Sequence, residues 1–554
     1  MPELRSFDCI IVGGGTAACV LANRLTENPA VRVLMVEAGP EPTSPWIKMP
    51  LAMGKLFTHP TLNWGFYTEP EAKLNNRTIF WPRGRVLGGS SSINGSAYVR
   101  GHAEDYDGWR RLGNVGWGWS DVLPYFNKLE LRQDLPAESR NPAGMLAVNY
   151  PTYLHPITRA FIEAGVRAGL PASSDLNGAV SEGISLMPNS VRRGIRQSSV
   201  ETFLRPASNR RNLTVETLAL ARRILLEGRK ATGIEYERNG KIQKALATRE
   251  VILSAGSIGS PQLLMLSGIG PGRHLQEHGI AVVADIPGVG ENLHDHPYTT
   301  CTYRTAPGNS LNPQLRGLRV GWHALNYYLA KRGPLTNGAS QATALARALP
   351  DSPCPDLQIV FRPMSHVFDS SGKISPDPVP RITGGVAYVR PKSRGRLLLK
   401  SADPRQAPAM YANYLAVASD EEGLLAGVKL VRRIFQTEPI KSRVVGEDSP
   451  GDACRTDNEI REYLHNAANT FCHPSGSCKM GQDAMAVVDE RLRVRGIESL
   501  RVIDASIMPA LPSAGPAPAV FMIAEKGADL IKEGQSPGAA SVVTEAASAV
   551  STRS

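Results

Sequence analysis

The first residues whose types and spacing could hold a ligand are glycines near the start of the chain. Gly13, Gly14 and Gly15 follow an apolar run over residues 7–12. Backbone amides at such a turn can approach a pyrophosphate, which the positive end of a following helix stabilises. Glu37 lies about 20 residues further on, where an acidic side chain accepts ribose hydroxyls. This stretch predicts a dinucleotide site without deciding which dinucleotide.

A second glycine-rich stretch covers residues 83–98 and contains four glycines and four serines. Small residues supply amides and hydroxyls without bulk, which suits backbone wrapped around a phosphate or a flat ring. Val86, Leu87 and Ile93 give the stretch an apolar side that a flexible linker would lack. We therefore expect it to be packed and to belong to the same site.

Three histidines could take part in chemistry. No further His, Asp or Glu accompanies His294 and His296 at the spacing of metal ligands, so polar structural roles are favoured for them. His473 lies between Cys472 and Cys478, and this spacing is not a zinc signature. A histidine titrates near working pH and can accept a proton. A lone histidine more often donates to a loop, so the residues alone leave the role of His473 open.

The elements that must position these residues are predicted from periodicity. We predict a Rossmann-like domain built from separated segments. Its strands are expected over 7–12, 31–36, within 213–253 and over 500–505, and its helices after the glycine turn, from Ser260-Pro261 and over 520–532.

The segment 301–480 has a different pattern of predicted elements. Short strands include a hairpin that joins 385–389 to 396–399, and capping boxes at Ser419 with Glu422 and at Thr456 with Glu459 open two helices. We predict an antiparallel sheet covered by helices, and hence an α/β (α+β) chain of two domains.

Composition narrows the class of protein. The chain has 554 residues, enough for at least two domains, and no uncharged apolar run long enough to span a bilayer. Its first strand begins so early that no signal peptide is expected, and seven cysteines fit reduced thiols in the cytoplasm. The net charge of +11 comes from dispersed arginines, so nucleic acid is not an expected partner.

Several motifs resemble those of the glucose–methanol–choline (GMC) oxidoreductases, flavoproteins that oxidise alcohols with FAD. The similar stretches are residues 84–107, 256–270, 292–296 and 473–478, and the likeness covers nearly the whole chain up to the tail. The choline dehydrogenase-like branch is nearest. The resemblance implies FAD-binding segments over 1–155, 201–300 and 481–533 and substrate-domain segments over 156–200 and 301–480. The tail over 534–554 is rich in Ala, Ser and Val without periodicity, so we expect it to be disordered.

The resemblance also implies roles for residues. His473 matches the family's base, which removes the hydroxyl proton while hydride passes to flavin N5. No metal is implied. The implied cofactor-binding residues are Gly13, Gly15, Thr16, Ala17, Glu37, Ala38, Arg85, Gly88, Gly89, Asn94, Gly95, Ser96, Ala97, Ala221, Asp504 and Ala505.

Two positions depart from the family pattern. Family members carry a second His or Asn before the last helix, and a gapless comparison places Ala517 there. Ile93 stands where some relatives carry a histidine that tethers the flavin, so we expect non-covalent FAD.

The expected substrate is a small-molecule alcohol, with oxygen or a quinone-like acceptor taking the electrons. A flavin-containing lyase, of the hydroxynitrile lyase or fatty acid photodecarboxylase type, stays open because Ala517 replaces a polar group and Arg390 could hold a carboxylate. A flavoprotein without turnover is the third alternative. The particular alcohol, the choice between oxidase and dehydrogenase, and the oligomeric state are not fixed by the sequence.

Overall fold

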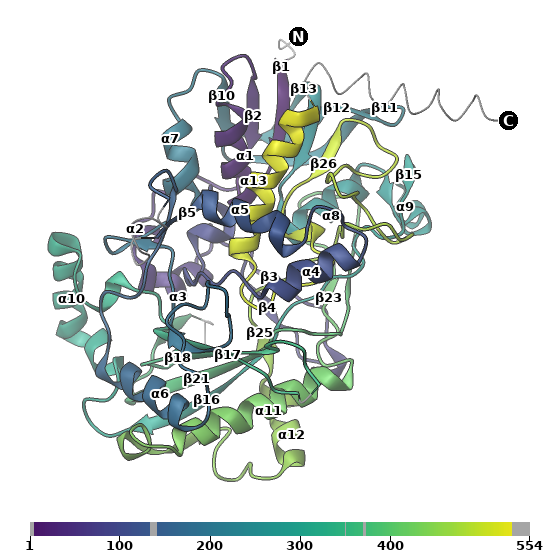
Figure 1. Cartoon of the computed structure of the whole chain (residues 1–554). Helices are drawn as coiled ribbons and strands as arrows, with labels where there is room; N and C mark the ends of the chain where they lie inside the picture. Colours follow the sequence, from purple (N-terminus) through teal and green to yellow (C-terminus); the bar gives the residue numbers. More distant parts are fainter. Residues whose placement is uncertain (1–4, 133–140, 350, 369–372, 535–554) are drawn as a thin grey trace.

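The computed structural model describes residues 5–132, 141–349, 351–368 and 373–534. The predicted disordered tail over 534–554 lies outside the described residues except for Gly534. Two large sheets form the frame of the molecule, one in the upper and one in the lower half of Figure 1. The prediction of a mixed α/β chain with a discontinuous first domain and an antiparallel second sheet is confirmed.

The first sheet joins strands from the two ends and the middle of the chain. Its core is parallel, and β12 and β11 extend it antiparallel at one edge. In spatial order its strands are β10 (Leu213–Glu216), β2 (Val33–Val36), β1 (Arg5–Val12), β13 (Lys241–Leu253), β12 (Lys230–Arg238) and β11 (Ala219–Glu227), with β26 (Leu500–Val502) also against β13. The apolar run of β1 is buried on both sides, as a central parallel strand requires.

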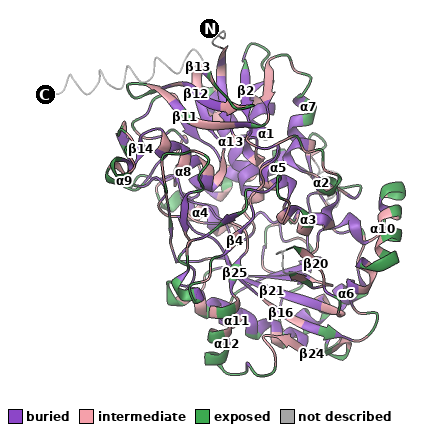
Figure 2. Ribbon diagram, turned by 180° about the vertical axis from the view of Figure 1, so that it is seen from behind, coloured by how far each residue is buried: buried purple, intermediate pink, exposed green. Residues whose placement is uncertain are grey.

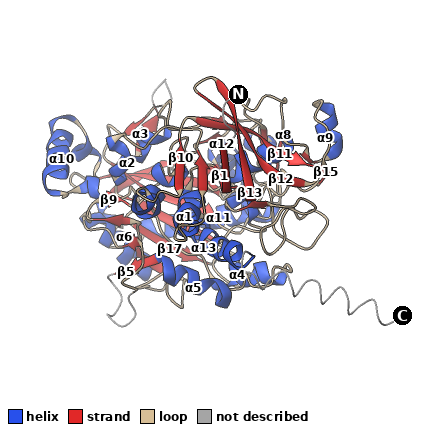
Figure 3. Cartoon of the chain, turned by 90° about the horizontal axis from the view of Figure 1, so that it is seen from above, coloured by secondary structure: helices blue, strands red, loops and turns tan. Residues whose placement is uncertain are grey.

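Helices cover this sheet and connect distant segments. α1 (Thr16–Leu25) packs against α13 (Ala517–Gly534), which also contacts α5 (Trp119–Leu129). Arg24 on α1 pairs with the fully buried Glu525 on α13 at 2.7 Å. Seen from above, α1 and α13 lie side by side (Figure 3). The first and last helices of the described chain therefore close one domain.

The predicted start of one helix is wrong. α8 extends over Gly256–Leu266, so it begins before Ser260 and carries Pro261 inside. Proline cannot donate to the carbonyl four residues earlier, that of Ser257. The Ser477 hydroxyl donates to this oxygen instead, at 2.5 Å, and so compensates for the missing backbone bond.

The second sheet is antiparallel. Its strands, in spatial order, are β24 (Val444–Ser449), β16 (Pro297–Thr305), β21 (Arg381–Tyr388), β18 (Leu357–Arg362), β17 (Ala342–Ala346) and β7 (Gly183–Leu186), with β25 (Asn469–Thr470) against β16. α11 (Ala418–Phe435) and α6 (Pro156–Arg167) cover one face, and α12 (Asp457–Ala467) packs on α11. Phe161 and Phe361 stack at 4.3 Å in the interface between helix and sheet.

Two local predictions in this domain are wrong and one is confirmed. β21 pairs with β16 and β18, whereas β22 (Arg396–Leu398) pairs with β23 (Ala409–Tyr411), so the two segments form no hairpin. α11 begins at Ala418 without a side-chain cap, so Ser419 opens no capping box. The capping box of Thr456 with Glu459 is present.

Short elements fill the space between the sheets, and most of the frame is buried (Figure 2). No helix in the described ranges combines the length and the apolar character needed to cross a bilayer. The shorter elements are α2 (Pro45–Lys48), α3 (Met53–Phe57), β3 (Phe66–Tyr67), β4 (Phe80–Trp81), α4 (Ala103–Arg111), β19 (His366–Phe368) and β20 (Ile374–Pro376). The longer helix α10 (Gly317–Ala330) lies at one edge of the molecule (Figure 1).

Candidate active site

A large cavity of about 1580 Å³ lies between the two sheets. It begins at the glycine turn after β1 and reaches β16 and β18 of the second sheet. His473, Ala517 and all the predicted cofactor residues line it except Arg85 and Gly88. The structure thus brings residues from both ends of the chain to one space.

The two glycine stretches pack backbone against backbone at one end of this cavity. Gly13 has φ +100°, and a Cβ there would lie 2.5 Å from the carbonyl oxygen of Ser254. Gly89 has φ +53°, and its Cβ would lie 2.8 Å from Cα of Gly15. Only glycine allows this approach, which leaves the amides at the start of α1 open to the cavity.

Arg85 and Gly88 lie next to this end of the cavity but outside its wall. The Gly88 amide donates to the carbonyl of Gly14 at 2.7 Å, and the Arg85 guanidinium lies over the Trp64 ring at 5.0 Å from its centroid. Gly88 therefore holds the second glycine stretch on the first, and neither Arg85 nor Gly88 lines the cavity.

Glu37 is fixed at the end of β2. One carboxylate oxygen accepts from the Gly14 amide and the other from the Gly39 amide, both at 2.7 Å. Burial raises the pKa of Glu37 to about 7, against the effect of these amides and of the Arg85 charge. Each oxygen keeps a lone pair that can accept a ribose hydroxyl.

A buried arginine that the sequence analysis missed organises the middle of the cavity. Arg196, 1% exposed, donates to the side-chain oxygens of Asn94 and Ser96, each at 2.9 Å, and to the backbone oxygen of Ile47 at 2.8 Å. Burial lowers its pKa to about 10. Because the Asn94 oxygen is engaged, its NH₂ group is the part left to donate into the cavity. No local sequence pattern marks Arg196.

Asp504 holds the corner between β13 and α8. Its carboxylate accepts from the Gly256 amide at 2.8 Å, the Ser260 hydroxyl at 2.6 Å and the Ser506 amide at 2.8 Å. The serine expected to cap α8 therefore binds this carboxylate, and Ala505 follows directly at the cavity wall.

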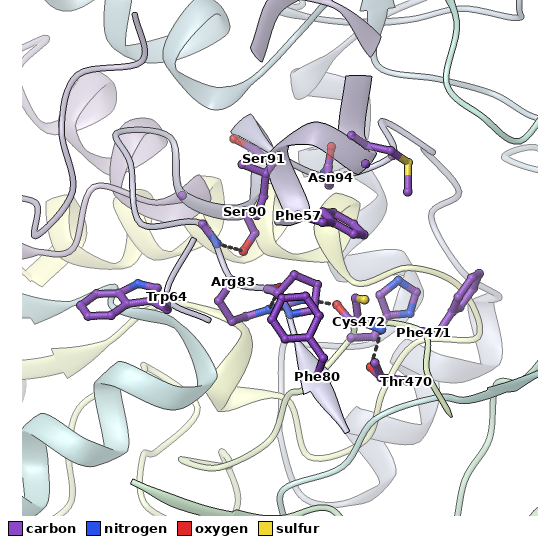
Figure 4. Close-up of a pocket in the computed structure, with 18 of the residues that line it drawn as sticks. Phe57, Trp64, Phe80, Arg83, Ser90, Ser91, Asn94, Thr470, Phe471 and Cys472 are labelled. Atoms are coloured by element: carbon purple, nitrogen blue, oxygen red, sulfur yellow. Dashed lines mark hydrogen bonds between the residues drawn. The ribbon is translucent and has the colours of Figure 1, made fainter. Parts of the chain in front are cut away.

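Two distant segments place His473 by pairing with each other. His294 and Ser475 exchange backbone hydrogen bonds of 3.1 and 2.9 Å, and β16 pairs with β25 next to them. The buried carboxylate of Asp295 accepts from the His473 amide at 2.8 Å and from the hydroxyls of Thr470 and Tyr414. Figure 4 shows the neighbouring residues Thr470, Phe471 and Cys472 across the pocket from Asn94.

His473 contacts a second histidine. Its Nδ1 lies 2.9 Å from Nδ1 of His296, and the two rings are nearly perpendicular. Burial lowers the pKa of His296 to about 3 and that of His473 well below its usual value, so both imidazoles are neutral. The sequence interpretation gave His296 a structural role. Its contact with His473 joins positions 177 residues apart, which sequence spacing does not reveal.

The loop before α13 approaches the other side of His473 at Gly515. A Cβ at Gly515 would lie 3.2 Å from Nε2 of His473, whereas Ala517 already begins the helix. The Ser513 hydroxyl is turned away and donates to Asp105 at 2.7 Å. The loop offers no polar side chain to Nε2, and Gly515 and Ala517 both line the cavity with His473.

Beyond His473 the cavity wall combines apolar and aromatic side chains with polar ones, among them Arg362, which lies over the Tyr298 ring. Its carboxylates at this end, Asp377 and Asp448, both pair with Arg381. Apolar and aromatic side chains there include Phe57, Phe80, Tyr298, Tyr328, Val360, Met364, Phe368 and Phe471. This composition suits an uncharged organic group.

Two further expectations concern ligands. Arg390 pairs with Asp105 and donates to the Pro355 carbonyl at 3.1 Å, so it does not present a guanidinium to a carboxylate in the cavity. Within the described ranges, no group of three or more His, Cys, Asp or Glu side chains is arranged to hold a metal ion.

Comparisons with known proteins agree with this geometry. The GMC oxidoreductase family models match residues 7–298 and 391–524. The chain is 41% identical to an alcohol dehydrogenase [acceptor] of Pseudomonas putida, over 95% of both chains, and 41% identical to human mitochondrial choline dehydrogenase, over 95% of this chain and 90% of the relative. A solved structure of pyridoxine 4-oxidase from Mesorbium loti superposes with a TM-score of 0.85 at 30% identity, covering 94% and 98% of the two chains.

Proposed function

Because the chain belongs to the GMC oxidoreductase family and acts on alcohols with FAD, we propose that its substrate is an uncharged, apolar alcohol and that His473 is the base. The contact of the neutral His473 with His296 at the apolar end of the cavity carries this proposal. The glycine turns, the open amides of α1 and the fixed Glu37 carboxylate fit the ADP half of FAD.

His473 performs the proton step. A neutral alcohol is a poor hydride donor and becomes a good one as its hydroxyl proton leaves. Nε2 of His473, which faces Gly515 and the cavity, takes that proton. FAD, when bound, supplies the acceptor for the hydride that leaves the alcohol carbon. Asp295 keeps the imidazole in place through the His473 backbone.

His296 determines which nitrogen of His473 is free. A neutral imidazole carries a proton on one of its two nitrogens, and the two Nδ1 atoms of this pair share one proton. The ring that donates from Nδ1 therefore has an unprotonated Nε2, and the ring that accepts at Nδ1 has a protonated Nε2. Nε2 of His296 is buried and has no hydrogen-bond partner in the described part of the chain, so the contacts of His296 leave the proton between the two Nδ1 atoms unassigned. For His473 to act as the base, its Nδ1 must donate to Nδ1 of His296, which leaves Nε2 of His473 unprotonated. His296 is a positioning residue.

The charge of the cavity selects against a cationic substrate. A quaternary ammonium group such as that of choline is usually held by aromatic faces together with a carboxylate. Here the nearby carboxylates of Asp377 and Asp448 are neutralised by Arg381. The acceptor in this proposal is oxygen or a quinone-like molecule, and the names of the relatives are consistent with either.

Three smaller proposals complete this function. We keep the division into FAD-binding segments 1–155, 201–300 and 481–533 and substrate segments 156–200 and 301–480. FAD is held non-covalently, since Ile93 offers no nucleophile and is packed among Ile47, Leu56 and Val86. The enzyme works in the cytoplasm, a proposal supported by seven free cysteines, six of them buried.

The test is anaerobic mixing of the purified holoenzyme with alcohols while flavin absorbance is recorded. 1-Octanol and benzyl alcohol should bleach the flavin, and choline should not. Faster bleaching by choline would overturn the substrate class. A holoenzyme that no alcohol bleaches, but that releases cyanide from a cyanohydrin or alkane from an illuminated fatty acid, would be a lyase.

The role of His296 has its own test. His296→Asn should lower kcat by about tenfold to a hundredfold at unchanged KM and shift the acid limb of the pH profile. His155→Asn, which alters another buried histidine outside the cavity, is the matched control and should change neither. Equal pH profiles for wild type and His296→Asn would rule out a positioning role.

A further inference from the structure

Helix α10 (Gly317–Ala330) projects from one edge of the molecule, where Figure 2 shows it largely exposed. Its apolar side chains are more exposed than those of other helices: Leu318 is 97%, Trp322 62% and Leu329 78% exposed. A soluble helix normally buries its apolar side. Here that side has no cover among the described residues.

The exposed side chains form one stripe. Leu318, Trp322, Leu325 and Leu329 follow each other at intervals of four, three and four residues, which places them on a single face of a helix. Tyr327 is on the opposite face and is buried. The stripe is therefore additional to the contacts that hold α10 on the protein.

Positive charge surrounds this stripe. The sequence has no Asp or Glu over residues 296–350, whereas Arg316 and Arg319 flank the start of α10 and Lys331 and Arg332 flank its end. None of these four side chains forms an ion pair within the described part of the chain. Arg316 donates to the Pro376 carbonyl at 2.8 Å and the Lys331 ammonium lies over the buried Tyr327 ring, so Arg319 and Arg332 are the cations left beside the stripe. A face that combines Trp, Leu and basic residues is typical of helices that lie in a membrane interface.

We propose that α10 docks this enzyme on the surface of a membrane that contains anionic lipids. The helix has 14 residues and is roughly 21 Å long, too short to span a hydrocarbon core, so it lies in the interface with its stripe in the acyl region. Arg319 and Arg332 complement the lipid phosphates.

A second copy of the chain fits this face less well. A two-fold contact through the stripe would bring the basic residues of both helices together, and no acidic residue over 296–350 would neutralise them. The charge pattern therefore favours an anionic bilayer over self-association.

Docking would also orient the cavity. Val320, Gly321, Ala324 and Tyr328 of α10 line the cavity that contains His473, on the side of the helix next to the stripe. An apolar alcohol or quinone dissolved in the bilayer would then enter beside the docked helix. This consequence rests on the proposed function, whereas the docking itself does not.

The experiment is flotation of the holoenzyme with vesicles of phosphatidylcholine alone or mixed with phosphatidylserine. Wild type should float with the mixed vesicles and be released by high salt. Leu318→Glu combined with Trp322→Glu should abolish flotation. The matched control, Leu112→Glu with Val115→Glu, alters two other exposed apolar residues and should float like wild type.

Charge is tested separately. Arg319→Gln with Arg332→Gln should weaken binding to the mixed vesicles about 25-fold, or about fivefold for each charge. Failure of wild type to float, or unchanged flotation of the stripe variant, would overturn the proposal, as would a wild-type dimer that the stripe variant dissociates. Anaerobic flavin reduction by soluble alcohols should be the same in all these variants, so loss of docking is distinguishable from failure of the proposed chemistry.

Discussion

The two ends of the cavity are built in different ways. The nucleotide end consists of backbone: Gly13 and Gly89 bring main chains within a few ångströms of each other, and Glu37 is held by two amides. The histidine end consists of side chains, and His473 depends on Asp295 and His296 from a segment far away in the sequence.

This difference affects how each end responds to change. A site built mainly from backbone tolerates few substitutions at its glycines, and apart from Glu37 it presents main-chain groups. In the proposed mechanism the histidine end depends on one proton acceptor, His473, whose position is set by Asp295 and His296. Cofactor binding and proton transfer should therefore be separable by mutation.

The sharpest way to separate them is His473→Ala. Loss of the base should lower the rate of alcohol-dependent flavin reduction by about 10²- to 10⁴-fold, while FAD stays bound because the glycine end is untouched. Stopped-flow absorbance measures the rate, and the visible spectrum gives FAD occupancy. A variant that keeps a tenth of the rate would show that another group removes the proton.

Gly89→Ala tests the other end of the cavity, because it alters the glycine contact and leaves His473 unchanged. A residue at φ +53° is strained by about 1–3 kcal/mol, and its Cβ would collide with Gly15. We expect FAD affinity to fall roughly fivefold to 150-fold, measured by fluorescence as the cofactor is titrated into apoenzyme. Turnover of the FAD-loaded fraction should stay near normal.

Gly108→Ala is the control for that measurement. Gly108 lies in α4, where a Cβ meets only the end of the flexible Arg111 side chain at 3.7 Å. Alanine there should leave FAD affinity unchanged. A similar loss in both variants would mean that the Gly89 effect is not specific to the glycine contact.

The same contrast explains what the sequence revealed. Glycine turns and Glu37 are local signals, because each element needs a particular residue at a fixed spacing, so the mixed α/β fold and the packing of the second glycine stretch could be predicted. The pairing of His296 with His473 requires two loops to meet, and Arg196 finds its acceptors about a hundred residues away. The hairpin predicted between residues 385–389 and 396–399 is wrong for the same reason: β21 pairs with β16 and β18, and such pairings between distant segments leave no local pattern in the sequence.

Buried neutral histidines also occur away from the site, and they should affect stability alone. Burial lowers the pKa of His155 to about 4, below its unfolded value of about 6.5. Between these values the unfolded chain binds more protons, so stability rises with pH through this window and is level above it.

His155→Asn should remove this share of the pH dependence. Asparagine can still cap α6, where the His155 ring accepts from the Ile157 amide. At about pH 5 the wild type should lose on the order of 2 kcal/mol through His155, and the variant should lose less between neutral and acid pH. Thermal melts at the two pH values measure the difference, and equal losses would contradict the buried neutral state.

The smallest expected effect comes from restoring a polar group opposite His473. The sequence comparison placed the missing residue at Ala517, but the loop approaches Nε2 of His473 at Gly515, where a Cβ would lie 3.2 Å away. Gly515→Asn should add one hydrogen bond to the alcohol oxygen and raise kcat/KM for small primary alcohols by about fivefold. The gain is limited because the imidazole must move slightly to make room. Bulky alcohols should lose rate, since the side chain occupies their space, and Ala517→Asn should give no gain. A gain from Ala517→Asn alone would instead show that the helix start, not the loop, faces the reacting oxygen.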